Sequence, residues 1–333
     1  YIIGEKTGGM PCASIVTCLF YGAISGSAPA TTAAVGTMTI PVLDEMGYDH
    51  SFSAATVAVA GGLGVIIPPS IPFIVYSMAS GVSVGDMFLA GIIPGCLIAV
   101  CLMVYAIYYC RTKGENKEKI HVTVNALKNK GFMCVLKESF WAILSPVFIL
   151  GGIYSGVVTP TEAALIGVIY SALVGMFIYK TLSLKDLIPA CIETVKTTAP
   201  MLIVLAAAAS FSRILSLLQA STVVENLLGP LLSHKVILLL IINLVLLVLG
   251  MIIDTSPSIL IFTPVMLPLA EAVGVDAVHF GIIMVVNLAI GFVTPPVGVN
   301  LYVAQSISSV PVLKLAQKVL PSAPTLKLAQ KKL

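Results

Sequence analysis

The amino-acid sequence predicts an all-α polytopic membrane protein built from inverted-topology repeats, with two re-entrant helical hairpins and two broken transmembrane helices. Of its 333 residues, 58% are hydrophobic and only 10% are charged, whereas soluble domains carry about 25% charged residues. The apolar residues form long uninterrupted runs, which favour membrane helices over alternating strands. A motif that occurs twice predicts the hairpins and the broken helices.

The repeated motif covers residues 25–76 and again residues 254–302. Each copy begins with a small polar cluster around a proline, continues through a Gly-x-Asp turn, and ends in a glycine followed four residues later by a double proline. The cluster proline and the double proline are 39 residues apart in the first copy and 38 in the second. The matching positions are Pro29 and Pro257, Gly64 and Gly291, and Pro68-Pro69 and Pro295-Pro296.

Breaks of this kind are costly inside a membrane. Proline cannot donate a backbone hydrogen bond, and glycine weakens a helix. Broken backbone at bilayer depth survives only where protein covers it or water reaches it. One such break is most simply a kinked helix, but two matching pairs favour a binding site between the internal repeats of a secondary transporter.

The first repeat begins with two short apolar segments, residues 10–24 and 30–43. Each is shorter than the roughly 20 residues that a membrane span needs. They therefore predict a re-entrant hairpin with its tip at residues 25–32, followed by a polar turn at 44–53. Residues 54–80 then predict a span broken at its glycines and prolines.

An ordinary span at residues 87–109 leads into a charged segment, 111–138, with seven Lys or Arg residues. This segment, 111–138, is predicted to form a cytoplasmic amphipathic arm, and residues 122–136 within it predict an amphipathic helix at the membrane interface. Three further spans are predicted at residues 140–153, 163–179 and 199–218. Two capping boxes, Thr159-x-x-Glu162 and Ser183-x-x-Asp186, predict helix starts, the second one of a short helix.

The second repeat consists of apolar arms at residues 236–253 and 258–270, followed by a broken span at 280–306. Placing the lysine-rich segment 111–138 in the cytoplasm makes the first hairpin enter from the cytoplasm and the second from outside. The domain prediction is as follows: 1–82, first transport-domain repeat; 83–235, scaffold with its arm; 236–307, second repeat; 308–333, a lysine-rich tail. The tail carries the hexapeptide Leu-Lys-Leu-Ala-Gln-Lys twice. This duplication is either amphipathic sequence or an artefact, and we assign no function to it.

The hairpin tips and the breaks offer hydroxyl and carbonyl oxygens, which suit a hard monovalent cation, Na+. Glycine lets backbone approach an ion closely, and the double prolines leave carbonyls near Val65 and Phe292 without partners along the helix. We expect at least two ions, one in each repeat. The predicted sodium ligands are Ser25, Ser27, Gly62, Gly64, Val65 and Pro68 in the first repeat and Asp254, Thr255, Ser256, Ser258, Gly291, Phe292 and Pro295 in the second.

Helix N-termini at the same breaks supply positive dipole ends for an anionic substrate. The candidate substrate contacts are Thr31, Thr32, Ser70, Asn287 and Asn300. For Ser70 and Asn300 the alternative role is to satisfy loose backbone locally. Asp254 also has two possible roles: it is a functional acid inside the membrane, or it caps the half-helix that follows it.

Several classes of function fit poorly. The seven cysteines form no C-x-x-C pair and read as free buried thiols, so Na+ is the only metal expected. The net charge of +3 is too small to indicate nucleic acid. An intramembrane aspartyl protease needs two embedded aspartates, and only Asp254 lies at depth, so we predict no enzyme. A channel is possible in principle, but opposed hairpins suit alternating access better.

These stretches resemble the large membrane subunit of tripartite ATP-independent periplasmic (TRAP) transporters. The resemblance rests on residues 25–32, 61–72, 151–164 and 254–300 and extends from about residue 10 to 321. It implies Na+-coupled uptake of sialic acid, a C4-dicarboxylate or another carboxylate by an elevator mechanism in the bacterial inner membrane. It also implies two partners, a small four-helix membrane subunit, separate or fused, and a periplasmic substrate-binding protein.

The resemblance leaves one close alternative, a Na+/dicarboxylate symporter that works without a binding protein. The family's large subunits have further helices before the first hairpin and usually an apolar helix at the end. The chain opens at Tyr1 without a methionine, so we expect it to be incomplete.

Overall fold

The computed structural model describes residues 4–129, 131–228 and 234–319, and every regular element in these ranges is helical. The second copy of the duplicated tail hexapeptide, 326–331, lies outside them. The elements are α1 (Gly9–Ser25), α2 (Ala28–Glu45), α3 (His50–Gly61), η1 (Gly62–Val65), α4 (Ile71–Ser80), α5 (Val84–Lys113), α6 (Lys117–Asn129), α7 (Phe132–Tyr154), α8 (Pro160–Leu173), η2 (Val174–Ile178), α9 (Leu184–Leu217), α10 (Ala220–Leu228), α11 (Lys235–Ile252), α12 (Thr255–Ala272), α13 (Ala277–Gly291), α14 (Val299–Ser308) and α15 (Val312–Val319).

Six of the described helices are long and apolar enough to cross a membrane. This confirms the predicted fold class of an all-α polytopic membrane protein. The capping boxes at Thr159 and Ser183 are also present. One expectation is wrong: the short helix after Ser183 and the span at 199–218 form a single helix, α9, of 34 residues. Pro189 and Pro200 lie inside it, because an apolar helix tolerates the loss of single backbone bonds.

In the first repeat, α1 and α2 form a hairpin whose tip turns at Gly26 with φ 61°. A left-handed residue of this kind ends a helix at little cost when it is glycine. Ser27 is extended and begins α2. The broken helix follows as α3, the short 3₁₀ segment η1, and α4, which the Ser70 side chain caps.

The second repeat has the same construction. Helices α11 and α12 are separated by Ile253 and Asp254, and the Asp254 carboxylate caps α12 by accepting from the Thr255 N–H at 2.8 Å. Helix α13 ends at Gly291, and α14 begins after a left-handed Gly298. The peptide bonds Pro68-Pro69 and Pro295-Pro296 are both cis. The predicted breaks are therefore confirmed at matching positions.

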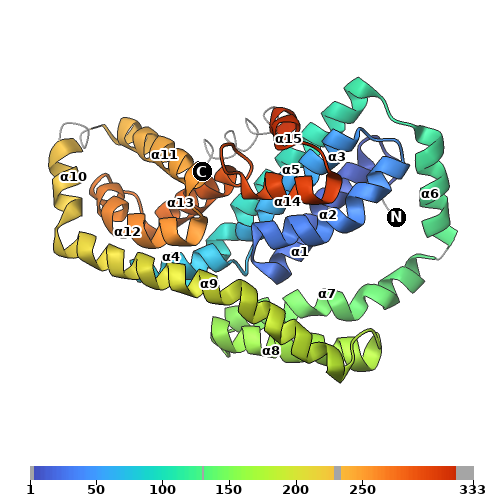
Figure 1. Ribbon diagram of the computed structural model, residues 1–333, viewed down its shortest axis with the longest axis horizontal. Helices are drawn as coiled ribbons and strands as arrows, with labels where there is room; N and C mark the ends of the chain where they lie inside the picture. The colour runs from blue at the N-terminus through green and yellow to red at the C-terminus, as the bar shows by residue number, and fades with distance from the viewer. Residues whose placement is uncertain (1–3, 130, 229–233, 320–333) are drawn as a thin grey trace.

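The two repeats exchange their final half-helices. Helix α4 of the first repeat packs against α12 of the second, and α14 of the second packs against α2 and α3 of the first. The α1–α2 and α11–α12 hairpins lie toward opposite ends of the molecule (Figure 1). The main buried core draws its members from α1–α5 and α11–α15 and, within the described residues, none from α6–α10.

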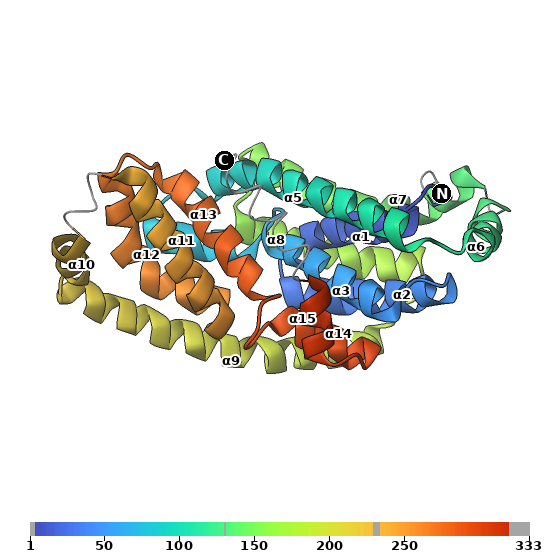
Figure 2. The same ribbon diagram turned by 90° about the horizontal axis from the view of Figure 1, so that it is seen from above.

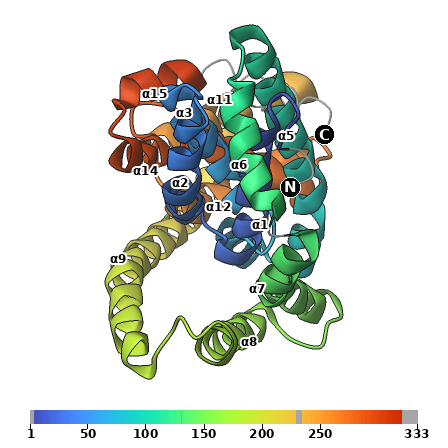
Figure 3. The ribbon, with the colours of Figure 1, turned by 90° about the vertical axis from the view of Figure 1, so that its right-hand side faces the viewer.

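Helices α7, α8 and α9 lie along one side of this core (Figures 1 and 3). Helix α7 packs on α8, and α9 packs on α12. Most of their large apolar side chains are exposed, as expected of surfaces that face lipid or another membrane protein. Helix α6 forms an arm at one end of the molecule (Figure 2), where Ile120 and Val124 pack against Met46.

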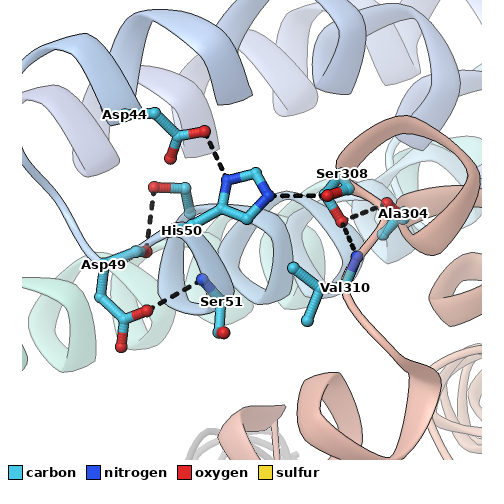
Figure 4. A network of polar contacts seen from close by, with 8 residues as sticks. Asp44, Asp49, His50, Ser51, Ala304, Ser308 and Val310 are labelled. Carbon is cyan, nitrogen blue, oxygen red and sulfur yellow. Dashed lines mark hydrogen bonds and ion pairs between the residues drawn. The ribbon is translucent and has the colours of Figure 1, made fainter.

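A polar contact joins the repeats at each end. At one end, His50 at the start of α3 contacts the Ser308 carbonyl at the end of α14, with Nε2 and O 2.7 Å apart (Figure 4). At the other end, the Tyr76 hydroxyl of α4 donates to the Ala277 carbonyl at the start of α13 at 2.7 Å. His50 follows Gly47 by three residues and Ala277 follows Gly274 by three, so both contacts involve the first residue of the helix after the turn. Their partners differ in position, since Tyr76 follows Pro68 by eight residues and Ser308 follows Pro295 by thirteen.

His50 lies in the polar turn outside the spanning segments, and both of its ring nitrogens face acceptors. Nε2 faces the Ser308 carbonyl and Nδ1 faces the Asp44 carboxylate. Only the imidazolium can donate at both nitrogens. The Ser308 carbonyl, with a further contribution from Asp44, raises the pKa of His50 above its ordinary value of 6.5. The Lys318 ammonium is held nearby by Asp49, 2.8 Å from its carboxylate.

The contact at His50 predicts a pH-dependent stability. Because the folded-state pKa is raised, the stabilisation is complete below pH 6.5 and disappears as pH rises through the folded-state pKa. His50→Gln should lower the thermal unfolding midpoint by about 1–2 °C at pH 6 and by less at pH 9, a modest effect because the pair is exposed. His279→Gln, an exposed histidine near the start of α13, is the control. An equal loss at both pH values would contradict the prediction.

Candidate functional site

The two hairpin tips and both breaks line one central cavity of about 160 Å³. It lies where the opposed halves of the molecule meet. Its lining residues are Gly26, Ser27, Pro29, Val65, Ile71, Pro72, Met201, Asp254, Thr255, Ser256 and Phe292. Segments more than 200 residues apart in the sequence thus form a single site, as the paired motif predicts.

Helix ends of both polarities converge on this cavity. The N-termini of α2, α4 and α12 contribute Pro29, Pro72 and Thr255. Chain just beyond helix C-termini contributes Gly26 after α1 and Phe292 after α13. Free N–H groups at N-termini carry partial positive charge, and free carbonyls at C-termini carry partial negative charge. The cavity therefore lies at helix ends of both polarities.

Pairs of glycines hold each hairpin against its break. Gly22 of α1 packs on Gly64, and Gly250 of α11 packs on Gly291. A Cβ on Gly22 would lie 2.8 Å from the Gly64 Cα, and a Cβ on Gly291 would contact the Gly250 carbonyl oxygen at 2.1 Å. Gly22 precedes Pro29 by seven residues, as Gly250 precedes Pro257. The same contact is therefore made twice, a feature that the sequence prediction missed.

Six predicted sodium ligands line the cavity, namely Ser27, Val65, Asp254, Thr255, Ser256 and Phe292. The others, Ser25, Gly62, Gly64, Pro68, Ser258, Gly291 and Pro295, are not among its lining residues. The Ser25 hydroxyl instead contacts the Thr31 hydroxyl at 2.8 Å. The Ser258 hydroxyl is fully buried and has no hydrogen-bond partner.

The carbonyls beside the double prolines do not match the expectation of free oxygens. The Val65 carbonyl accepts from the Ser70 hydroxyl at 2.6 Å, and the Phe292 carbonyl accepts from the Asn300 N–H at 3.0 Å. In both repeats the next half-helix supplies the donor. A carbonyl oxygen has two lone pairs, so each can still contact an ion.

The predicted substrate contacts lie behind the cavity wall. Thr31 donates to the Ser27 carbonyl at 2.8 Å and Thr32 to the Ala28 carbonyl at 3.0 Å. The Asn300 amide donates to the Ala58 carbonyl at 3.0 Å, and its side-chain oxygen is buried without a partner.

Asn287 lies elsewhere in the second repeat. Its amide nitrogen donates to the Asn243 side-chain oxygen at 2.6 Å and to the Ile283 carbonyl at 2.8 Å. It joins α13 to α11 and is not among the residues that line the cavity.

Met201 also lines the cavity and is the one lining residue from outside the two repeats. It was not among the residues predicted from the sequence. It follows Pro200 inside α9, and nothing in its own sequence context separates it from the surrounding apolar run.

The fold and the site together define a multi-pass membrane protein with a central site between two internal repeats. Comparison with known families gives the class more closely. Residues 1–328 match the family model described as the DctM component of the tripartite ATP-independent periplasmic transporter. The chain belongs to this family, whose members are transporter permeases of the inner membrane rather than enzymes.

Individual relatives span several substrates. The chain is 44% identical to an isethionate TRAP transporter permease protein, DctMQ, of Oleidesulfovibrio alaskensis, over 96% of this chain and 50% of that protein. It is 37% identical to the C4-dicarboxylate large permease DctM of Pseudomonas aeruginosa, over 96% of this chain and 73% of that protein. It is 35% identical to the sialic acid large permease SiaM of Vibrio cholerae, over 96% and 74%. The chain thus spans from half to about three quarters of the length of these relatives.

The glycine contacts predict a sharp difference between neighbouring positions of one break. A Cβ at Gly64 would lie 2.4 Å from the Thr31 hydroxyl and 2.8 Å from the Ser27 carbonyl, whereas a Cβ at Gly62 would meet only the Ala289 carbonyl at 3.9 Å. Gly64→Ala should therefore destabilise the protein by about 1–3 kcal/mol, and Gly62→Ala should be tolerated. Thermal unfolding in detergent measures both, and equal effects would contradict the described packing.

Proposed function

We propose that the protein is the membrane-embedded part of a Na+-coupled importer for a small organic acid. The observation that carries this proposal is the convergence of both hairpin tips and both breaks on one cavity. A site shared by two opposed repeats, near the middle of an apolar protein, suits alternating access.

The polarity of the cavity supports an anionic substrate. The positive dipole ends of α2 and α12 line it, and anions are stabilised at such ends. The α4 end contributes less, because the Ile71 and Phe73 N–H groups already donate within the protein and Pro72 has no N–H. The Ser27 and Ser256 hydroxyls add neutral hydrogen-bonding groups. A carboxylate or a sulfonate matches this arrangement.

The Asp254 carboxylate supports coupling to a cation. Its negative charge lies in the same cavity as the N-termini and opposes an anion that arrives alone. A sodium ion held by Asp254, by the tip hydroxyls and by the carbonyls at Val65 and Phe292 offsets that repulsion. Substrate and ion then bind better together than apart, which is the requirement for symport. We propose Na+ at both repeats, with the predicted ligands outside the lining forming the supporting layer.

The size of the cavity supports a short acid. About 160 Å³ is well below the roughly 300–1,000 Å³ of sites for drug-sized ligands. A two- to four-carbon acid, such as the isethionate or C4-dicarboxylate named for two of the relatives, fits this volume better than a sialic acid.

We further propose an elevator mechanism with two partners. The core shared by α1–α5 and α11–α15 forms the moving body, and α6–α10 belong to the static part. This assigns α5 to the moving body rather than to the predicted scaffold 83–235, because its buried side chains belong to the shared core. The exposed apolar faces of α7–α9 suit a small four-helix membrane subunit and lipid. A periplasmic substrate-binding protein delivers the acid, as in TRAP systems.

Uptake into proteoliposomes by the complete transporter tests this proposal. With an inward Na+ gradient and the binding protein present, a labelled C4-dicarboxylate or isethionate should accumulate. Uptake without a Na+ gradient would contradict the coupling. Uptake at full rate without any binding protein would favour a symporter that works alone.

Ser27 provides the matched test of the site. Ser27→Leu replaces a cavity hydroxyl with an apolar side chain, so uptake should fall at least about 100-fold, as is typical when a binding group is lost and the site is filled. Ser216→Leu, at an exposed position on α9, should leave uptake unchanged. Equal uptake by the two variants would contradict the proposal that this cavity binds the substrate or the coupling ion.

A further inference from the structure

Met201 gives the cavity a wall that belongs to neither repeat. The other lining residues come from the hairpins and broken helices, which share one buried core. Met201 comes from α9, which contributes no buried member to that core among the described residues. The volume of the cavity therefore depends on how α9 sits against the α12 tip.

Met201 lies on the inward-facing side of α9, together with Leu205, which is half-buried, and Ala208, which is buried. Met201 is half-buried, whereas its three successors on α9, residues 202–204, are 59%, 71% and 49% exposed. The preceding Pro200 removes one backbone hydrogen bond of the helix. Helix α9 itself packs along α12, whose first residues Thr255 and Ser256 line the cavity opposite.

A methionine side chain can form a cavity wall that adapts to ligands of different size. Its side chain is long, unbranched and polarizable, so it fills space of irregular shape and adjusts to different contacts. The tip residues cannot vary in this way, since a Cβ at Gly26 would lie 2.9 Å from the Pro69 carbonyl oxygen. The repeats fix the polar part of the site, and the residue on α9 is free to differ in size.

We propose that Met201 is the specificity-determining residue that sets the largest acid the cavity accepts. This inference rests on the function proposed above. The N-termini and hydroxyls hold one anionic group, and the methionine side chain limits how far the rest of the acid can extend. Shortening the side chain admits longer acids, and a bulkier side chain excludes them.

Uptake of a series of unbranched dicarboxylates from four to seven carbons by the complete transporter tests this role. Met201→Ala should raise the uptake efficiency of the longest acids relative to the four-carbon acid by about tenfold or more, the usual effect of a methylene or two in an apolar pocket. Met201→Phe should shift the ratio the other way. Met201→Leu, which conserves volume, should keep the wild-type profile and verifies that the position tolerates change.

Leu202→Ala is the matched control, because it shortens the next, exposed residue of the same helix. It should leave the profile unchanged. A Met201→Ala profile identical to that of the wild type, in a transporter that moves the four-carbon acid, would overturn the inference and leave the proposed function intact. Failure of the wild type to move any of the acids would overturn both.

Discussion

The structure depends on one constraint, the need to give every backbone polar group a partner where helices are interrupted inside apolar surroundings. An unpaired N–H or carbonyl costs several kcal/mol there. The protein brings both hairpin tips and part of each break to one cavity, and the interrupted backbone groups pair with one another. The Ile71 N–H donates to the Gly26 carbonyl in the first repeat, and the Val297 N–H donates to the Met251 carbonyl in the second. The paired glycines make these contacts possible, because only a residue without a Cβ lets two backbones approach so closely.

The exchange of half-helices makes the two repeats one body. Neither repeat buries its own final half-helix, since α4 packs on α12 and α14 packs on α2. Asn300 adds a specific hydrogen bond across this interface, from its amide to the Ala58 carbonyl. Any motion that separates one hairpin from the other must break this packing first. In the proposed elevator mechanism the core therefore moves as a unit against α6–α10, most of whose large apolar side chains are exposed.

The sequence predicted most of the fold because its strongest signals are local. Capping residues, Gly-x-Asp turns and double prolines mark element ends directly, so the positions of both hairpins and both breaks are confirmed. The continuity of α9 was not predictable in the same way. A proline such as Pro200 usually lies near a helix terminus, so the sequence predicted a separate span that starts at residue 199. The site was predictable in part for the same reason. Ser27 and Asp254 stand at tips that the motif marks, whereas Met201 enters the cavity only through the packing of α9 on α12.

The cross-repeat contacts at the two ends both involve the first residue of α3 or α13, but they differ in chemistry. A duplicated architecture with matching ends would respond in the same manner to the solution on either side. At the start of α3 the His50 imidazole makes the contact, whereas at the start of α13 the Ala277 backbone carbonyl accepts from the Tyr76 phenol. Protonation therefore strengthens the contact at the start of α3, whereas the contact at the start of α13 contains no imidazole. Of these two contacts, His50 makes one responsive to acidity near neutral pH.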